Sequence, residues 1–262
     1  VFKLETAPLN GSITISGNVF TYTHDGSETS TDSYTFSAND GTASSIPATV
    51  SITITSVDSS PVTSFAYIST NEGGNIDYDL SSLTSDADTN SGLVYTIQVV
   101  PTNGVLYIGG TNTPITAGTT IVGSSVTYLH NSSETTTDAF AWFANDGNSN
   151  SNVSTFSIAV NAVNDVPTII SSTTQVDEQD NVDITIQGND GENSNLTYKI
   201  VSAPSNGILA DSTGAELIDG SSILGDTVIY THTSSISANA TDSFTVIAND
   251  GSADSSVATL NL

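Results

Sequence analysis

The sequence contains no cysteine, no methionine and no arginine, and its only basic side chains apart from histidine are Lys3 and Lys199. Without cysteine there can be no disulfides and no thiolate chemistry, so the chain must derive its rigidity from another source. The two lysines face 28 acidic residues, which gives a formal net charge of −26. We therefore expect no nucleic-acid partner, because phosphate is bound through basic patches.

Long apolar runs are also missing. No stretch approaches 18 apolar residues, and the chain does not open on a basic segment followed by an apolar one. We therefore expect no membrane insertion and interpret the chain as an internal piece of a longer secreted protein. With so few cations, the carboxylates would repel one another in the compact state unless divalent metal ions or salt supplied positive charge.

One long motif occurs three times. It reads "YTHDGSETSTDSYTFSANDG" from Tyr22, "YLHNSSETTTDAFAWFANDG" from Tyr128 and "YTHTSSISANATDSFTVIANDG" from Tyr230, and a "PxNG" tetrapeptide precedes each copy. A period near one hundred residues is too long for a solenoid unit, so each repeat is interpreted as a whole domain. The linkers "VDSSP" and "VNDVP" predict domains at residues 1–60, 61–166 and 167–262.

Within each repeat the apolar residues alternate with polar ones. "VSITITS" at residues 50–56 places Val50, Ile52 and Ile54 on one face, and no window shows helical periodicity. Short strands with frequent turn signals, about 100 residues per unit, indicate all-β, immunoglobulin-like Greek-key sandwiches. The cysteine pair of antibody domains is missing, so this likeness concerns architecture alone.

The first repeat is shorter than the others. Pro61 and Pro101 are 40 residues apart and Pro167 and Pro204 are 37 apart, whereas only seven residues precede Pro8. About 30 residues, or two strands, are therefore expected to be missing in front of Val1. Either the sequence is cut from a longer array, or strands from a neighbouring chain complete this sandwich head to tail.

The order of the motifs carries a family resemblance. The second repeat contains "TNEGG", "SDADTN", "PTNG", "TTDAFAWFANDG" and "VNDVP", and the third contains "VDEQD", "GNDGENSN", "PSNG" and "ATDSFTVIANDG". These strings resemble the cadherin-like tandem repeats of large bacterial surface adhesins. The resemblance implies sandwiches joined end to end as an extended rod, with alternate aromatics in the core. We expect the aspartates of the "TDS"-like motif to cap a turn, namely Asp32, Asp138 and Asp242.

The resemblance also implies calcium at the domain junctions. Ca²⁺ prefers six to eight carboxylate, amide and carbonyl oxygens on flexible loops. The expected ligands are Glu72, Asp86, Asp88, Asp146, Asn164, Asp165, Glu178 and Asp190. The first linker keeps only Asp58, so its junction is expected to be weaker. The alternative is that these acidic loops form ordinary turns without metal.

The sequence does not favour an enzyme. Its three histidines, His24, His130 and His232, occupy one equivalent position in three repeats, which is typical of a structural contact. Zinc would need several His or Cys side chains close together. The lone tryptophan, Trp142, takes a core position in the repeated motif.

The sequence therefore predicts a non-enzymatic, calcium-stabilised extender segment of a bacterial cell-surface adhesin or extracellular fibre. Its expected partners are the neighbouring repeats of the same chain. Two alternatives remain open. One is a self-assembling filament or surface-layer subunit of identical chains, and the other is a module that binds surface polysaccharide through exposed Tyr and Trp.

Overall fold

The computed structural model describes residues 1–262 except 89–91, 178, 193 and 234–240. Apart from one short 3-10 helix, η1 (Leu80–Leu83), every regular element in the described residues is a β-strand. The chain divides into two compact units, Val1–Val160 and Asn161–Leu262. The first unit contains both the first and the second repeat, so the predicted boundary at residues 60 and 61 stays a prediction.

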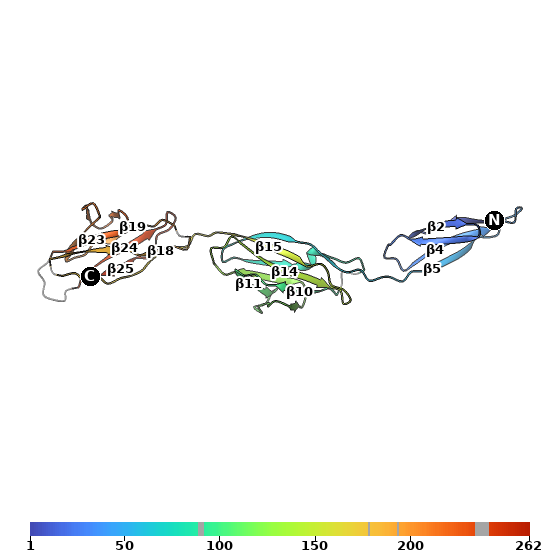
Figure 1. Cartoon of the computed structure of the whole chain (residues 1–262), viewed down its shortest axis with the longest axis horizontal. Helices are drawn as coiled ribbons and strands as arrows, with labels where there is room; N and C mark the ends of the chain where they lie inside the picture. The colour runs from blue at the N-terminus through green and yellow to red at the C-terminus, as the bar shows by residue number, and fades with distance from the viewer. Residues whose placement is uncertain (89–91, 178, 193, 234–240) are drawn as a thin grey trace. The chain divides into compact units, whose positions relative to one another are not determined.

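The first repeat consists of two small sheets, whose strands lie side by side in Figure 1. One sheet has the order β1-β4-β5 and the other is the hairpin β2-β3. The strands are β1 (Phe2–Thr6), β2 (Gly11–Ser16), β3 (Val19–His24), β4 (Thr31–Ala38) and β5 (Ala48–Thr53).

The second repeat has a five-stranded sheet, β12-β10-β14-β15-β7, a three-stranded sheet, β11-β13-β8, and the short pair β6-β9. Its strands are β6 (Val62–Thr63), β7 (Ala66–Asn71), β8 (Asn75–Asp79), β9 (Thr84–Ser85), β10 (Val94–Val99), β11 (Gly104–Ile108), β12 (Thr119–Ile121), β13 (Ser125–His130), β14 (Thr137–Asn145) and β15 (Ser154–Asn161).

The third repeat has two four-stranded sheets, β17-β23-β20-β21 and β22-β19-β24-β25, and the short pair β16-β18. Its strands are β16 (Thr168–Ile169), β17 (Asn181–Thr185), β18 (Gly188–Asn189), β19 (Thr197–Ser202), β20 (Gly207–Ala210), β21 (Glu216–Leu217), β22 (Ser222–Ile223), β23 (Thr227–His232), β24 (Ser243–Asn249) and β25 (Ala258–Asn261).

The core of the second repeat follows from alternation along its strands. In β14 the side chains of Asp138, Phe140, Trp142 and Ala144 are buried, and the residues between them are not. Phe140 and Trp142 share one cluster with buried residues of both sheets, including Leu106 from β11. Two sheets that bury their inner faces against each other form a sandwich. The prediction of all-β, immunoglobulin-like sandwiches is confirmed.

An aspartate anchors one turn in every repeat, and it is buried in the first and second. Asp138 accepts hydrogen bonds from the backbone N–H of Thr102 (3.0 Å), Asn103 (2.9 Å) and Ala139 (2.9 Å), and from the Tyr128 hydroxyl (2.9 Å). Asp32 and Asp242 make the corresponding bonds in the other repeats. The predicted turn-capping role of these three aspartates is confirmed.

The same turn needs glycine at position 104, because there is no room for a side chain there. A Cβ atom on Gly104 would lie 2.5 Å from a ring carbon of Tyr128 and 2.6 Å from the Leu129 carbonyl oxygen. Both distances are too short for non-bonded atoms, so the "PxNG" turn needs glycine at its last position. The turn, the tyrosine and the aspartate therefore form one packed unit.

Replacing the anchor should destabilise the second repeat. Asp138→Ala leaves two turn N–H groups and the Tyr128 hydroxyl without their acceptor, so the free energy of unfolding should fall by about 2–4 kcal/mol. Trp142 is the only tryptophan of the chain and is fully buried in this repeat. Its fluorescence during urea unfolding therefore reports on this repeat alone. Asp77→Ala is the control, because Asp77 is exposed and accepts a side-chain bond from Thr127. An equal loss in both variants would contradict the anchoring role.

The equivalent anchor in the third repeat should make stability depend on pH. Burial acts to raise the pKa of Asp242, but the backbone N–H groups of Ser205, Asn206 and Ser243 outweigh it and lower the pKa. Because the folded pKa lies below the unfolded value of about 3.9, the ionised carboxylate stabilises the fold above that pH. This stabilisation is lost as the pH falls through the folded pKa. The stability gap between the wild type and Asp242→Asn, measured by calorimetry, should therefore narrow from pH 7 to pH 3. A constant gap would contradict this explanation.

Candidate functional site

The first linker is fastened to the repeat that follows it. Both carboxylate oxygens of Asp58 accept side-chain hydrogen bonds, from Asn148 Nδ2 (2.8 Å) and from Ser149 Oγ (3.0 Å). The backbone N–H of Ser59 donates to Asp88 Oδ2. Asn148 and Ser149 lie in the "NDG" turn after β14, so this turn and the Asp86–Asp88 loop hold the linker from two directions.

The "NDG" turn itself contains a carboxylate oxygen without a protein partner. Asp146 Oδ1 accepts the backbone N–H groups of Asn148 and Ser149, both at 2.7 Å, and these bonds lower the pKa of Asp146. Asp146 Oδ2 is buried and has no hydrogen-bond partner in the described residues. An ionised oxygen in that position is poorly solvated, and a cation would compensate for the lost water.

The third repeat holds its linker in a corresponding way, with donor and acceptor exchanged. Here the amide is on the linker and the carboxylate on the turn, because Asn164 Nδ2 donates to Asp250 Oδ2 (2.9 Å). The backbone N–H of Asp165 donates to Glu192 Oε1 (2.8 Å), just as Ser59 donates to Asp88. In both repeats the linker is thus attached to the "NDG" turn and to an acidic loop.

Two further oxygens of this cluster have no partner. Asp190 is only 7% exposed, and its Oδ1 accepts the backbone N–H of Ser194 at 2.9 Å. Its Oδ2 and Glu192 Oε2 are buried without a hydrogen-bond partner among the described residues. Both lie on the loop that follows β18, beside the linker that Glu192 contacts. This loop, the linker and the "NDG" turn form the acidic cluster of the third repeat.

The two clusters are not preformed metal centres. Within the described residues, no group of three or more His, Cys, Asp or Glu side chains converges on one point. The donors present are nevertheless those that Ca²⁺ uses, namely carboxylates, amide oxygens and backbone carbonyls on loops. The unpartnered oxygens of Asp146, Asp190 and Glu192 fit a hard cation, which would draw the loops together.

Comparisons with known proteins find a matching family for two parts of the chain. Residues 72–160 match the family described as cadherin-like, and residues 1–53 match the family described as bacterial Ig domain. Residues 72–160 are thus similar to a cadherin-like domain and residues 1–53 to a bacterial immunoglobulin-like domain. The family resemblance of the sequence is thereby confirmed. No curated protein has a significant match to the chain.

Solved structures similar to this chain include cadherin ectodomains. The human desmocollin-1 ectodomain is 14% identical, with a TM-score of 0.44, and the alignment covers 100% of this chain and 50% of that one. Protocadherin gammaB7 domains EC3–6 are 15% identical, with a TM-score of 0.47 and coverage of 99% and 66%. Domains 1–4 of protocadherin gammaB7 are 13% identical, with a TM-score of 0.49 and the same coverage. The chain thus spans half to two thirds of these proteins.

The other predicted ligands are Glu72, Glu178 and Asp86. Glu72 lies in the turn between β7 and β8 of the cadherin-like domain, and the whole of β8 separates it from Asp86. Glu178 lies outside the described residues. Asp86 Oδ1 accepts the backbone N–H of Asp88 (2.8 Å), which is an ordinary turn bond. Calcium ligation by these residues stays a prediction.

One acidic residue near this cluster was missed by sequence reasoning. Glu28 of the bacterial immunoglobulin-like domain interacts with Asp88, and the shared hydrogen bond and the charge of Asp88 raise the pKa of Glu28. Two carboxylates in contact favour either a shared proton or a bound cation. No recognised motif marks Glu28, because it sits in a Ser-rich turn whose acidic character is unremarkable in this sequence.

The histidines and the tryptophan have structural positions. His130 is 2% exposed, with Nδ1 accepting the N–H of Gly73 (3.3 Å) and Nε2 bonded to Thr135 Oγ1 (3.0 Å). His24 makes the equivalent contact with Thr29. Trp142 is fully buried, so it is not available to stack on a sugar.

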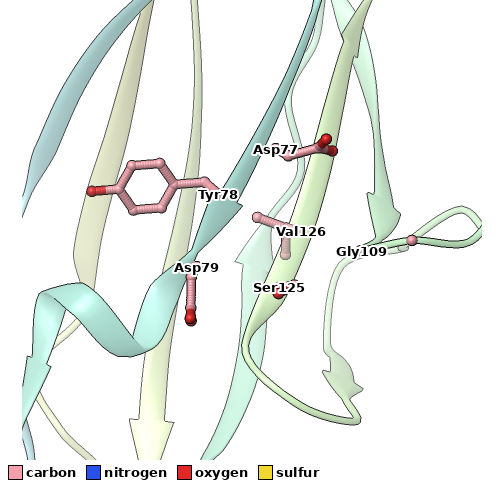
Figure 2. Close-up of a pocket in the computed structure, with 7 residues that line it drawn as sticks. Asp77, Tyr78, Asp79, Gly109, Ser125 and Val126 are labelled. Carbon is pink, nitrogen blue, oxygen red and sulfur yellow. The ribbon is translucent and has the colours of Figure 1, made fainter.

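A shallow hollow of about 470 Å³ lies on the cadherin-like domain (Figure 2). It is lined by Asp77, Asp79, Gly109, Ser125 and neighbouring residues. Both carboxylates accept local hydrogen bonds, Asp77 from Thr127 and Asp79 from Ser81. The two carboxylates of the hollow are therefore already hydrogen-bonded. Among the described residues no helix is long and apolar enough to cross a membrane.

Proposed function

We propose that residues 1–262 form a non-enzymatic, calcium-stabilised spacer of a secreted bacterial surface adhesin or extracellular fibre, built from domains at 1–60, 61–166 and 167–262. The cadherin-like and bacterial immunoglobulin-like domains support an adhesive or structural role outside the cell. The observation that carries the calcium part of the proposal is the carboxylate of Asp190, which is buried with one oxygen unpartnered.

Asp190 argues for a cation because only one of its two oxygens has a hydrogen-bond donor among the described residues. Burying an ionised carboxylate is costly unless it is paired or fully hydrogen-bonded. The only lysine of the third repeat is Lys199, which is exposed on β19. Ca²⁺ would supply the missing positive charge and coordinate oxygens of this kind.

The residues proposed to hold the ion either hold the linkers or lie on the same loops and turns as residues that do. In the third repeat they are Asn164, Asp165, Asp190, Glu192 and Asp250, and in the second repeat they are Asp58, Asp86, Asp88 and Asp146. Asp58 fixes the first linker to the "NDG" turn, and Asn164 does the same for the second. The backbone N–H of the linker residue that follows is accepted by Asp88 in the second repeat and by Glu192 in the third. A bound cation that compensates the acidic charge at these points would stiffen the connection between the repeats. A distal module could then be held away from the cell.

Calcium should raise the melting temperature of the chain. In calorimetry, titration from chelator to several millimolar Ca²⁺ should shift the transition upward, with half-saturation of about 0.1–1 mM, as is typical of extracellular modules. Asp190→Asn should lose most of the shift assigned to the third repeat. Asp183→Asn removes one charge from an exposed position of β17 and serves as the matched control. Equal shifts in the wild type and in Asp190→Asn would contradict the assignment of the site.

The linkers should become accessible to protease when calcium is removed. Without the cation, repulsion between the clustered carboxylates acts against the few hydrogen bonds that fasten residues 57–61 and 163–167. Cleavage of the 262-residue chain with a protease of broad specificity, followed by mass spectrometry, should locate new cuts in these segments under chelation. Identical cleavage patterns with and without chelator would contradict the proposal of a calcium-stabilised spacer.

A further inference from the structure

The chain enters the second repeat through a polar contact that is shielded from water. Val62 and Thr63 form the short strand β6, directly after the proline that ends the first linker, and Thr63 is only 4% exposed. The Asn152 side chain binds both backbone groups of Thr63. Its Oδ1 accepts the Thr63 N–H (3.0 Å), and its Nδ2 donates to the Thr63 carbonyl oxygen (2.9 Å). Asn152 therefore pairs with Thr63 as a residue of a neighbouring strand would.

Side-chain hydroxyls complete this contact. Thr63 Oγ1 donates to the carbonyl oxygen of Asn152 (2.8 Å) and lies within hydrogen-bond distance of Ser154 Oγ (2.9 Å). Asn152 Nδ2 also donates to Ser154 Oγ (3.1 Å), and Ser154 is only 6% exposed. We call Thr63, Asn152 and Ser154 the entry cluster. Because hydrogen bonds constrain distance and direction together, the entry cluster fixes β6 in one position on the second repeat.

The third repeat begins without an entry cluster. Its first strand, β16, pairs with β18 as β6 pairs with β9, and Ile169 takes the position of Thr63. The Ile169 side chain packs against the apolar core instead. The other two positions of the cluster, counted from the "NDG" turn, are Ser256 and Ala258 in this repeat. Since Ile169 and Ala258 have no polar side-chain atom, the hydrogen-bond network of the second repeat cannot form in the third.

The entry cluster contains no ionisable side chain. The bonds that fasten the first linker, in contrast, involve the carboxylates of Asp58 and Asp88. Loss of a cation increases the repulsion among carboxylates but leaves the bonds between neutral amides and hydroxyls unchanged. The attachment of the linker and the attachment of β6 should therefore respond differently when calcium is removed.

We propose that Asn152 is a positioning residue that holds β6 on the second repeat without calcium, so that loosening of the first linker ends at Pro61. In the third repeat, loosening of residues 163–167 would continue into β16. The inference rests on the proposed spacer function, because a spacer carries tension through the points where the chain enters each repeat. With β6 held in place, the segment that loosens before the second repeat keeps a fixed length.

Two equivalent amides allow the proposal to be tested within one molecule. The Ser64 N–H donates to the Leu83 carbonyl oxygen and the Ile170 N–H to that of Gln187, both at 2.9 Å. Each amide lies directly after the entry strand of its repeat. In the 262-residue chain under chelator, hydrogen exchange followed by NMR should give Ser64 a protection factor at least about tenfold higher than that of Ile170.

Substitution of Asn152 should remove this difference. Asn152→Ser introduces the residue that the third repeat has at this position, and it should lower the protection of Ser64 at least about tenfold. Asn150→Ser is the matched control, because the Asn150 side chain bonds to Asn145 of the same turn (2.7 Å), and it should leave Ser64 unchanged. Amides of β14 should exchange equally in all three proteins, which separates release of β6 from unfolding of the whole repeat.

Three results would overturn the proposal. The first is equal protection of Ser64 in the wild type and in Asn152→Ser. The second is a tenfold rise in Ser64 protection when calcium is added to the wild type, and the third is faster exchange of β14 together with Ser64 in Asn152→Ser. A chain in which calcium changes neither Ile170 protection nor the melting temperature would contradict the calcium-stabilised spacer, whereas a protected Ser64 in that chain would still support the role of Asn152.

Discussion

The scarcity of cations is the constraint on which the rest of this structure depends. With 28 acidic residues and two lysines, the carboxylates cannot be satisfied by ion pairs. Among the described residues only Lys3–Glu5 and His24–Asp25 lie within ion-pair distance. The carboxylates instead accept hydrogen bonds from backbone N–H groups and from Ser, Thr, Asn and Tyr side chains. Acidic residues therefore act here as turn anchors. The position of each one in the fold determines how many hydrogen-bond donors its carboxylate can reach.

Two kinds of acidic site result from this constraint. Asp138 collects three backbone N–H groups and a tyrosine hydroxyl, so all its hydrogen bonds are made within one repeat and it needs no ion. Asp146 and Asp190 each find donors for one oxygen and leave the other buried without a partner. The first kind fixes the sandwich at one turn. The second kind lies beside the linkers, where a bound cation would act on the connection between repeats and leave the fold of each repeat unchanged.

The sequence predicted the features that repeat. The repeated motif marked Trp142 as core, and three copies of its "TDS"-like part marked the aspartate as a turn cap. The linker bonds were harder to predict from the sequence, because donor and acceptor exchange places between the two linkers. Asp58 of the first linker accepts from Asn148, whereas Asn164 of the second linker donates to Asp250. Burial of Asp190 and the contact of Glu28 with Asp88 depend on how loops distant in sequence fold over one another. Such contacts leave no periodic signal in the chain.

Comparing the repeats with one another separates what a strand's sequence requires from what its surroundings supply. β6 and β16 take the same place in their repeats, yet hydrogen bonds to Asn152 hold Thr63, whereas Ile169 packs against the core. The place of the strand is therefore kept while the interaction that holds it changes. The same reasoning applies to the linkers, where Asp58 and Asn164 are chemically different side chains that reach the same turn. In both cases the position in the fold, more than the residue type, determines which partner is needed.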